Sequence, residues 1–122
     1  MICVPISTGE LFDKYTILQI KTEKIKDTGK LSSLNQEIHH LTPFIDFEDD
    51  VCVHFLESLK IINLKLWEIE DAIRIKESVK QFDSDFILLA RSVYMTNDER
   101  HRMKSNINKV FNSKISDIKS YA

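Results

Sequence analysis

Residues 51–80 read VCVHFLESLKIINLKLWEIEDAIRIKESVK, and this stretch contains neither glycine nor proline. Its apolar side chains recur three and four residues apart, which is the spacing of one face of an α-helix. A helix of this length is roughly 40 Å long, whereas a compact domain of this chain length is only about 35 Å across. We therefore expect the helix to project from the domain or to have a partner of equal length. The apolar face consists of Phe55, Leu59, Ile62, Leu66, Ile69 and Ile73.

The residues on either side of this stretch predict further helices. The motifs STGE at 7–10 and TNDE at 96–99 place a hydroxyl residue three positions before a glutamate, which is the capping-box pattern of a helix start. Gly29 and Pro43 are residues typical of the end of a helix. The expected helices cover 8–26, 30–41, 84–95 and 97–120, with an extended arm over 1–6 and an acidic connection over 44–50.

Glycine and proline content also bears on the fold class. The chain has two of each, all before residue 44, and turn-rich β architectures need many more. A chain of 122 residues fits one domain, and 43% hydrophobic against 30% charged residues argues against disorder. The sequence therefore predicts a single all-α domain over 1–122, a four- to five-helix bundle with one long central helix.

Charge and cysteine usage limit the functional classes. A net charge of −2 provides no general attraction to nucleic acids or anionic membranes, so we expect neither as a partner. No apolar run approaches the length of a membrane span, and no signal peptide is recognisable. Cys3 and Cys52 lie far apart without metal-ligand spacing, which favours free thiols in a reducing compartment. We expect a cytoplasmic protein.

Arginine is the informative cation of this chain. Lysine outnumbers arginine 13 to 4, and the 16 isoleucines against 3 alanines indicate an AT-rich coding sequence. An arginine retained against that bias is expected to do something that lysine cannot, such as binding a carboxylate or phosphate through two parallel N–H donors. Three of the four arginines lie within 91–104.

These arginines predict an anion-accepting pocket. Helix N-termini near guanidinium groups favour anions, and a helix is expected to start at Asn97. We expect Arg74 and Arg91 to bind one anionic group together, either a carboxylate of the protein or a ligand, so that replacing either with lysine costs stability or affinity. A capped helix junction with ordinary ion pairs explains the same residues equally well. The predicted ligand-binding residues are Arg74, Arg91, Tyr94, Asn97 and Arg100, with Trp67 and Glu70 from a polar stripe on the long helix.

Two carboxylate pairs give an alternative with a metal. Glu10 with Asp13 and Glu68 with Asp71 are each three residues apart, so each pair projects from one helix face. Two such helices can hold Mg²⁺, as in all-α nucleotide pyrophosphohydrolases, if the four carboxylates meet within about 5 Å. Salt bridging along single helices is the simpler explanation of the pairs. The four histidines show no zinc-ligand spacing.

Three long blocks of the sequence carry a family resemblance. They read ISTGELFDKYTILQIKTEKI at 6–25, LWEIEDAIRIKE at 66–77 and FILLARSVYMTNDERHRMKSNIN at 86–108. The blocks resemble an uncharacterised family of small helical proteins from bacteria and their phages, some of which are found with sugar-transfer enzymes. The resemblance implies a link to surface-polysaccharide metabolism and assigns no activity to any residue. The polar residues singled out above lie in these blocks, together with Lys14, Lys21 and Lys104.

The function that we predict is binding. The leading prediction is a helical interaction module, without cofactor, that accepts a small anionic ligand and forms a homo-oligomer. Self-association is expected because Ile61, Leu64 and Ile75 lie off the main apolar face of the long helix. The alternative is a Mg²⁺-dependent hydrolase or transferase that acts on a phosphorylated small molecule. The sequence leaves open whether the protein is an enzyme.

Overall fold

The computed structural model describes residues 1–115, and within that range it consists of helices and connecting loops without a strand. The all-α fold class is confirmed, with four α-helices in the described part. The elements are α1 (Thr8–Lys24), α2 (Thr28–Leu41), the short 3₁₀ helix η1 (Thr42–Phe44), α3 (Asp50–Ser78) and α4 (Ser84–Val110).

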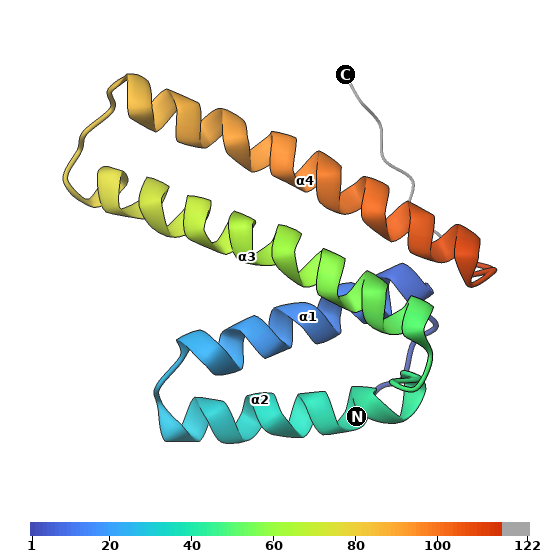
Figure 1. Ribbon diagram of the computed structural model, residues 1–122. Helices are drawn as coiled ribbons and strands as arrows, with labels where there is room; N and C mark the ends of the chain where they lie inside the picture. The colour runs from blue at the N-terminus through green and yellow to red at the C-terminus, as the bar shows by residue number, and fades with distance from the viewer. Residues whose placement is uncertain (116–122) are drawn as a thin grey trace.

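The long helix has a partner of equal length. Helices α3 and α4 run side by side in opposite directions as a hairpin, and α1 crosses the end of this hairpin that is remote from its turn (Figure 1). Helix α1 contacts both hairpin helices, whereas α2 packs on α1 (Figure 1). Since α1 diverges from α3, the turn end of the hairpin has neither α1 nor α2 beside it. Both expectations for the long helix, an equal partner and projection, are therefore met.

The core lies where α1 crosses the hairpin. Phe12 from α1, Leu59 from α3 and Ile107 from α4 are between 0% and 2% exposed. The ring of Phe111 packs edge-on against Phe12, with 5.5 Å between the ring centroids. Towards the turn, from residue 67 to residue 95, no side chain is fully buried. The fully buried side chains of α3 and α4 thus all lie outside the turn end of the hairpin.

The predicted break within the last helices is wrong. Helix α4 continues through Thr96 and Asn97 without interruption. Thr96, the expected cap, is 1% exposed within the packed end of the hairpin, and the Asn97 side chain accepts a hydrogen bond from Arg100. Nothing in TNDE prevents helical backbone, so packing decides for one helix.

The boundaries of the other helices differ from the prediction by a few residues. The second helix begins before Gly29, because Asp27 accepts a hydrogen bond from the Lys30 N–H and acts as its cap. Helix α4 ends at Val110, and Asn112 has a positive φ of 54°. The prediction of a helix over 111–115 is therefore wrong. The expected continuation over 116–120 lies outside the described residues.

Two further expectations concern thiols and membranes. Cys52 is buried in the core and Cys3 is exposed on the arm, and both thiols are free. Burial raises the pKa of Cys52. Within residues 1–115, none of the helices has the length and apolar character needed to cross a membrane.

Candidate functional site

A carboxylate is buried where α1 meets both helices of the hairpin. The side chain of Asp13 is 1% exposed, and its Oδ1 accepts one hydrogen bond from the Asn63 amide at 3.0 Å and one from Arg100 Nε at 2.8 Å. A second guanidinium nitrogen of Arg100 pairs with Oδ2. The pair is bidentate, which fixes its geometry as well as its charge. Asp13 on α1 is thereby tied to α3 through Asn63 and to α4 through Arg100.

Acidic neighbours stabilise the positively charged form of Arg100. The hydrogen bonds that Arg100 donates to Asp13 raise the pKa of Arg100, burial opposes this effect, and the charges of Asp13, Glu10 and Glu70 raise the pKa further. A guanidinium is protonated at any ordinary pH, so the consequence is a fixed cation. The influence of Glu70 also shows that the polar stripe on α3 begins close to this network.

The start of α1 docks directly on the end of α4. A Cβ added at Gly9 would lie 2.6 Å from the Lys104 carbonyl oxygen, so this approach requires glycine. The Gly9 N–H donates to Asn108 Oδ1 at 2.7 Å, and Lys104 Nζ donates to Glu10 Oε2 at 2.7 Å. Ser7 Oγ accepts from the Glu10 N–H as the helix cap. The N–H groups of Gly9 and Glu10 at the N-terminus of α1 therefore have partners in the chain itself.

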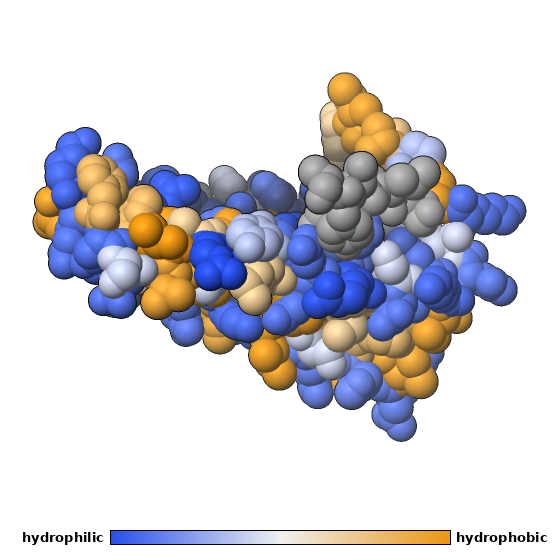
Figure 2. All heavy atoms as spheres, turned by 90° about the horizontal axis from the view of Figure 1, so that it is seen from above, coloured by the Kyte–Doolittle hydropathy of each residue, from blue (hydrophilic) through white to orange (hydrophobic). Residues whose placement is uncertain are grey.

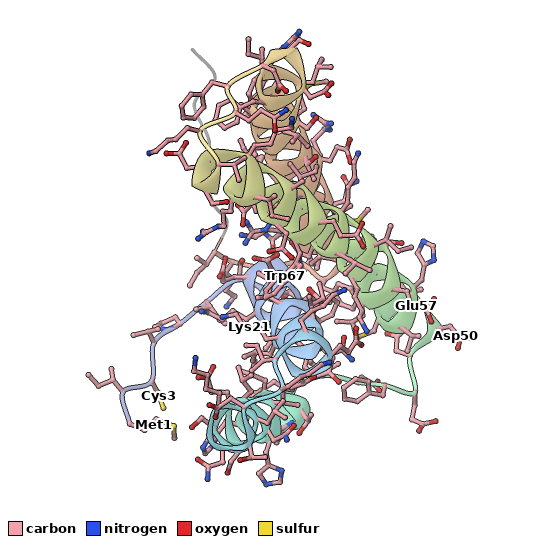
Figure 3. The ribbon with its side chains drawn as sticks, turned by 90° about the vertical axis from the view of Figure 1, so that its left-hand side faces the viewer. Met1, Cys3, Lys21, Asp50, Glu57 and Trp67 are labelled. Atoms are coloured by element: carbon pink, nitrogen blue, oxygen red, sulfur yellow. The ribbon has the colours of Figure 1, made fainter. Side chains whose placement is uncertain are left out.

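A cleft of about 460 Å³ opens beside this network, between α1 and α2. Its volume lies in the range of small-molecule sites. Glu10, Asp13 and Arg100 of the network line it, and Met1 of the arm reaches it. The arm lies on the same side of the molecule as Lys21 (Figure 3). The remaining lining residues are Lys14, Ile17, Leu18 and Lys21 from α1, and Glu37, His40 and Leu41 from α2.

The charges of the cleft are unequally matched. Glu10 and Asp13 are paired with Lys104 and Arg100 of α4. Lys14 and Lys21 form no ion pair with any residue of the described part of the chain. The cleft thus presents two unmatched lysines against the single carboxylate of Glu37. This arrangement favours an anionic ligand.

The structure separates the predicted anion-binding arginines from the cleft. Arg74 and Arg91 are exposed, Tyr94 is 55% exposed, and none of the three lines the cleft. Asn97 lies inside α4, so the expected helix N-terminus beside the arginines does not exist. The prediction of a helix start at Asn97, on which the proposed pocket depended, is therefore wrong.

The other three predicted residues are Arg100, Glu70 and Trp67, and the charge of Glu70 acts on Arg100. Arg100 lines the cleft, and it also lines a shallow hollow of about 330 Å³ on α4 with Asn97, His101 and Lys104. Trp67 is half-buried on α3 and does not line the cleft. The bidentate arginine that the composition predicted exists, but it is Arg100 and its carboxylate belongs to the protein.

The carboxylate pairs predicted for Mg²⁺ do not meet. Glu10 and Asp13 are engaged by α4 cations, whereas Glu68 and Asp71 are exposed on α3. Across residues 1–115, the structure holds no group of three or more histidine, cysteine, aspartate or glutamate side chains that could bind a metal ion. The convergence that the metal alternative requires is thus missing from the part of the chain that the structure describes.

Sequence reasoning did not assign ligand-binding roles to Lys14, Lys21, Glu37 or His40. The signal for the lysines was present, because residues seven apart lie on the same face of a helix, and Ile17 lies between them. Glu37 and His40 had no such signal. Their place opposite α1 depends on how α2 folds back, which no local pattern specifies.

Comparison with known proteins defines the family without a function. Neither the curated proteins nor the solved structures include a match to this chain. A family model described as a family of unknown function, DUF6165, matches residues 2–122. The match agrees with the expectation of an uncharacterised family. Because it covers nearly the whole sequence, the chain belongs to DUF6165, a family of unknown function.

Proposed function

We propose that the protein is a helical binding module that takes a small anionic ligand in the cleft between α1 and α2. The observation that carries this proposal is the pair of unmatched lysines, Lys14 and Lys21, on one wall of a cleft of about 460 Å³. Ile17 and Leu18 lie between them and provide apolar surface. Small-molecule sites typically combine such an apolar lining with a few charged groups that orient the ligand.

The two lysines favour a ligand with phosphate groups and a ring. They lie about 10.5 Å apart along the helix axis, so their flexible side chains can bind neighbouring phosphates or the two ends of one diphosphate. The apolar residues between them can pack against a base or a sugar ring. Nucleoside diphosphates and nucleotide sugars meet both requirements. The resemblance to proteins found with sugar-transfer enzymes makes nucleotide sugars the first probes to use, within a role in surface-polysaccharide metabolism.

Thermal unfolding in the presence of defined probes tests the proposal. Pyrophosphate, UDP and UDP-glucose should raise the melting temperature saturably, and uncharged uridine should not. A ligand at 100 times its Kd adds about 2.7 kcal/mol to the stability of the folded state, which is easily measured. The proposal fails if none of the three anionic probes stabilises the protein.

Matched charge variants separate the cleft from general electrostatics. Lys14→Gln with Lys21→Gln should abolish the shift. Lys24→Gln with Lys26→Gln removes the same charge from exposed positions that do not line the cleft, and should preserve the shift. Equal losses in both double variants would show non-specific attraction and would contradict a site in the cleft.

Divalent cations distinguish the binding module from the hydrolase or transferase alternative. Without other ligands, Mg²⁺ or Mn²⁺ should change the melting temperature no more than an equal ionic strength of NaCl. A saturable shift that disappears in Glu68→Gln or Asp71→Asn would favour the enzyme, because these exposed carboxylates have no role in the proposed cleft.

A further inference from the structure

The turn end of the α3–α4 hairpin exposes large apolar side chains. Ile75 is 65% exposed, Val79 64%, Leu88 57% and Met95 53%, and Ile61 further along α3 is 70% exposed. Hydrophobic side chains gather at the surface of this projecting end (Figure 2). Exposed apolar groups on neighbouring turns of two helices are typical of protein–protein contacts.

These side chains share the side of the hairpin that faces away from α1. On α3, Asn63 faces α1, and Ile61, Ile75 and Val79 lie more than about 110° around the helix axis from it. On α4, Arg100 faces α1, and Leu88 and Met95 are displaced by a similar angle. The two helices thus present apolar side chains along one side of the hairpin, and we call this side, over the whole length of α3, the outer face.

The outer face has a net negative charge on α3 and a net positive charge on α4, with Lys65 of α3 and Asp98 of α4 as the opposite charges. Helix α3 carries the exposed carboxylates Glu57 and Glu68, and α4 carries the exposed guanidinium groups of Arg91 and Arg102. Within the described part of the chain, none of these four side chains forms an ion pair. An acidic helix beside a basic helix is complementary to a second copy of itself turned by 180°.

The register of the hairpin determines which groups then meet. Lys65 pairs with Glu99, and Lys76 pairs with Asp83, so residues near 70 on α3 are level with residues near 91 on α4. A two-fold axis parallel to the helices places α3 of one copy against α4 of the other at the same level. This brings Glu68 close to Arg91 of the second copy.

We propose that the outer face is the interface of a two-fold symmetric dimer. In this dimer α3 of each copy packs against α4 of the other, and the two hairpins form an antiparallel four-helix bundle. Such an isologous contact uses the same patch on both copies and closes on itself. The outer face is about 43 Å long and about 20 Å wide, so each copy covers on the order of 800 Å², the area of a stable interface. The proposal does not depend on the ligand cleft.

The mass of the full chain in solution tests the dimer. Sedimentation velocity between 1 and 100 µM should show a species of twice 14.3 kDa. The apolar variant Ile75→Asp with Leu88→Asp should raise the dimer Kd at least about 100-fold, and circular dichroism should show unchanged helix content because both side chains are exposed. A 14.3 kDa monomer at 100 µM would overturn the proposal.

Charge reversal then tests the orientation. Arg91→Glu with Arg102→Glu should weaken the dimer at least about tenfold, and adding Glu57→Arg with Glu68→Arg should restore it. Arg74→Glu is the matched control, since Arg74 is exposed on the side of α3 that faces α1. A dimer that tolerates the first reversal, or that the combined reversal fails to restore, would show that the second copy does not pack α3 against α4.

Discussion

The two ends of the α3–α4 hairpin differ in what they bury: one end buries polar side chains, and the other leaves large apolar side chains exposed. Where α1 crosses the hairpin, Asp13, Thr16 and Thr96 are no more than 1% exposed. At the turn end, Val79 and Leu88 are more than half exposed. Hydrophobicity alone therefore does not separate interior from surface in this protein. What separates them is the number of helices that pack together at a given position along the hairpin. Polar groups can be buried only where a second and a third helix provide hydrogen-bond partners.

The buried polar side chains have hydrogen-bond partners within the protein. Among the described residues, every buried side-chain nitrogen and oxygen has a hydrogen-bond partner. Asn63 donates both to Asp13 and to Thr16 Oγ1, each at 3.0 Å. A complete polar network of this kind specifies one arrangement of helices, since a shift in register leaves charges unpaired.

Removing the buried charge should give the largest effect. Asp13→Asn leaves the half-buried Arg100 guanidinium without its counter-charge, and we expect a loss of about 3 kcal/mol in the free energy of unfolding. Urea unfolding monitored by circular dichroism measures it. Asp71→Asn, on an exposed carboxylate of α3 outside the outer face, should change stability by less than about 0.5 kcal/mol. Equal effects of the two substitutions would refute the contrast between the ends of the hairpin.

Filling the contact between α1 and α4 should be the next most costly change. Gly9→Ala pushes a methyl group against the Lys104 backbone, and we expect a loss of about 2 kcal/mol. At Gly29 an added Cβ would lie 3.3 Å from the Asp27 side chain, so Gly29→Ala should stay within about 0.5 kcal/mol of the natural protein. Chemical unfolding measures the free energy of unfolding of both variants. If Gly9→Ala left this free energy unchanged, α1 could move away from α4 without cost, which would contradict the prediction.

The arginines provide a comparison along the hairpin. Arg100→Lys loses the bidentate pair with Asp13 and should cost about 1–2 kcal/mol. Arg74→Lys, Arg91→Lys and Arg102→Lys affect exposed side chains and should each cost less than about 0.5 kcal/mol in the monomer. Unfolding at a concentration below dimer formation tests this ranking. A costly Arg74→Lys or Arg91→Lys would restore the role that the composition predicted for them.

The smallest effect should come from the cap of α4 at the turn end. Hydrogen bonds from the Phe86 N–H and from Lys76 lower the pKa of Asp83. A lowered pKa in the folded state means that ionised Asp83 stabilises the fold above its unfolded pKa, and that this stability is lost as pH falls through the folded value. Asp83→Asn should therefore lower the melting temperature at pH 7, and the difference from the natural protein should shrink towards about pH 3. A difference independent of pH would contradict this role of the charge.

The sequence predicted the helices well because their signals are local. The spacing of Leu59 and Leu66 indicates a helix over α3 whatever surrounds it, and Ser7 caps α1 as the STGE motif predicts. Composition also indicated that arginine has a special role. The continuity of α4 could not be read in this way, because TNDE fits both a helix start and a helix interior, and the burial of Thr96 decides between them.

The sequence by itself determined the all-α class, the long helix and the kinds of side chain available for a site. Only the tertiary structure decided that Asp13 meets Arg100, 87 residues away, and that Lys14 and Lys21 line a cleft with α2. The physical reason is the range of the interactions. Helical periodicity and caps act over three or four residues, whereas the pairing of charges between helices follows from how the apolar faces pack, and that packing is a property of the whole chain.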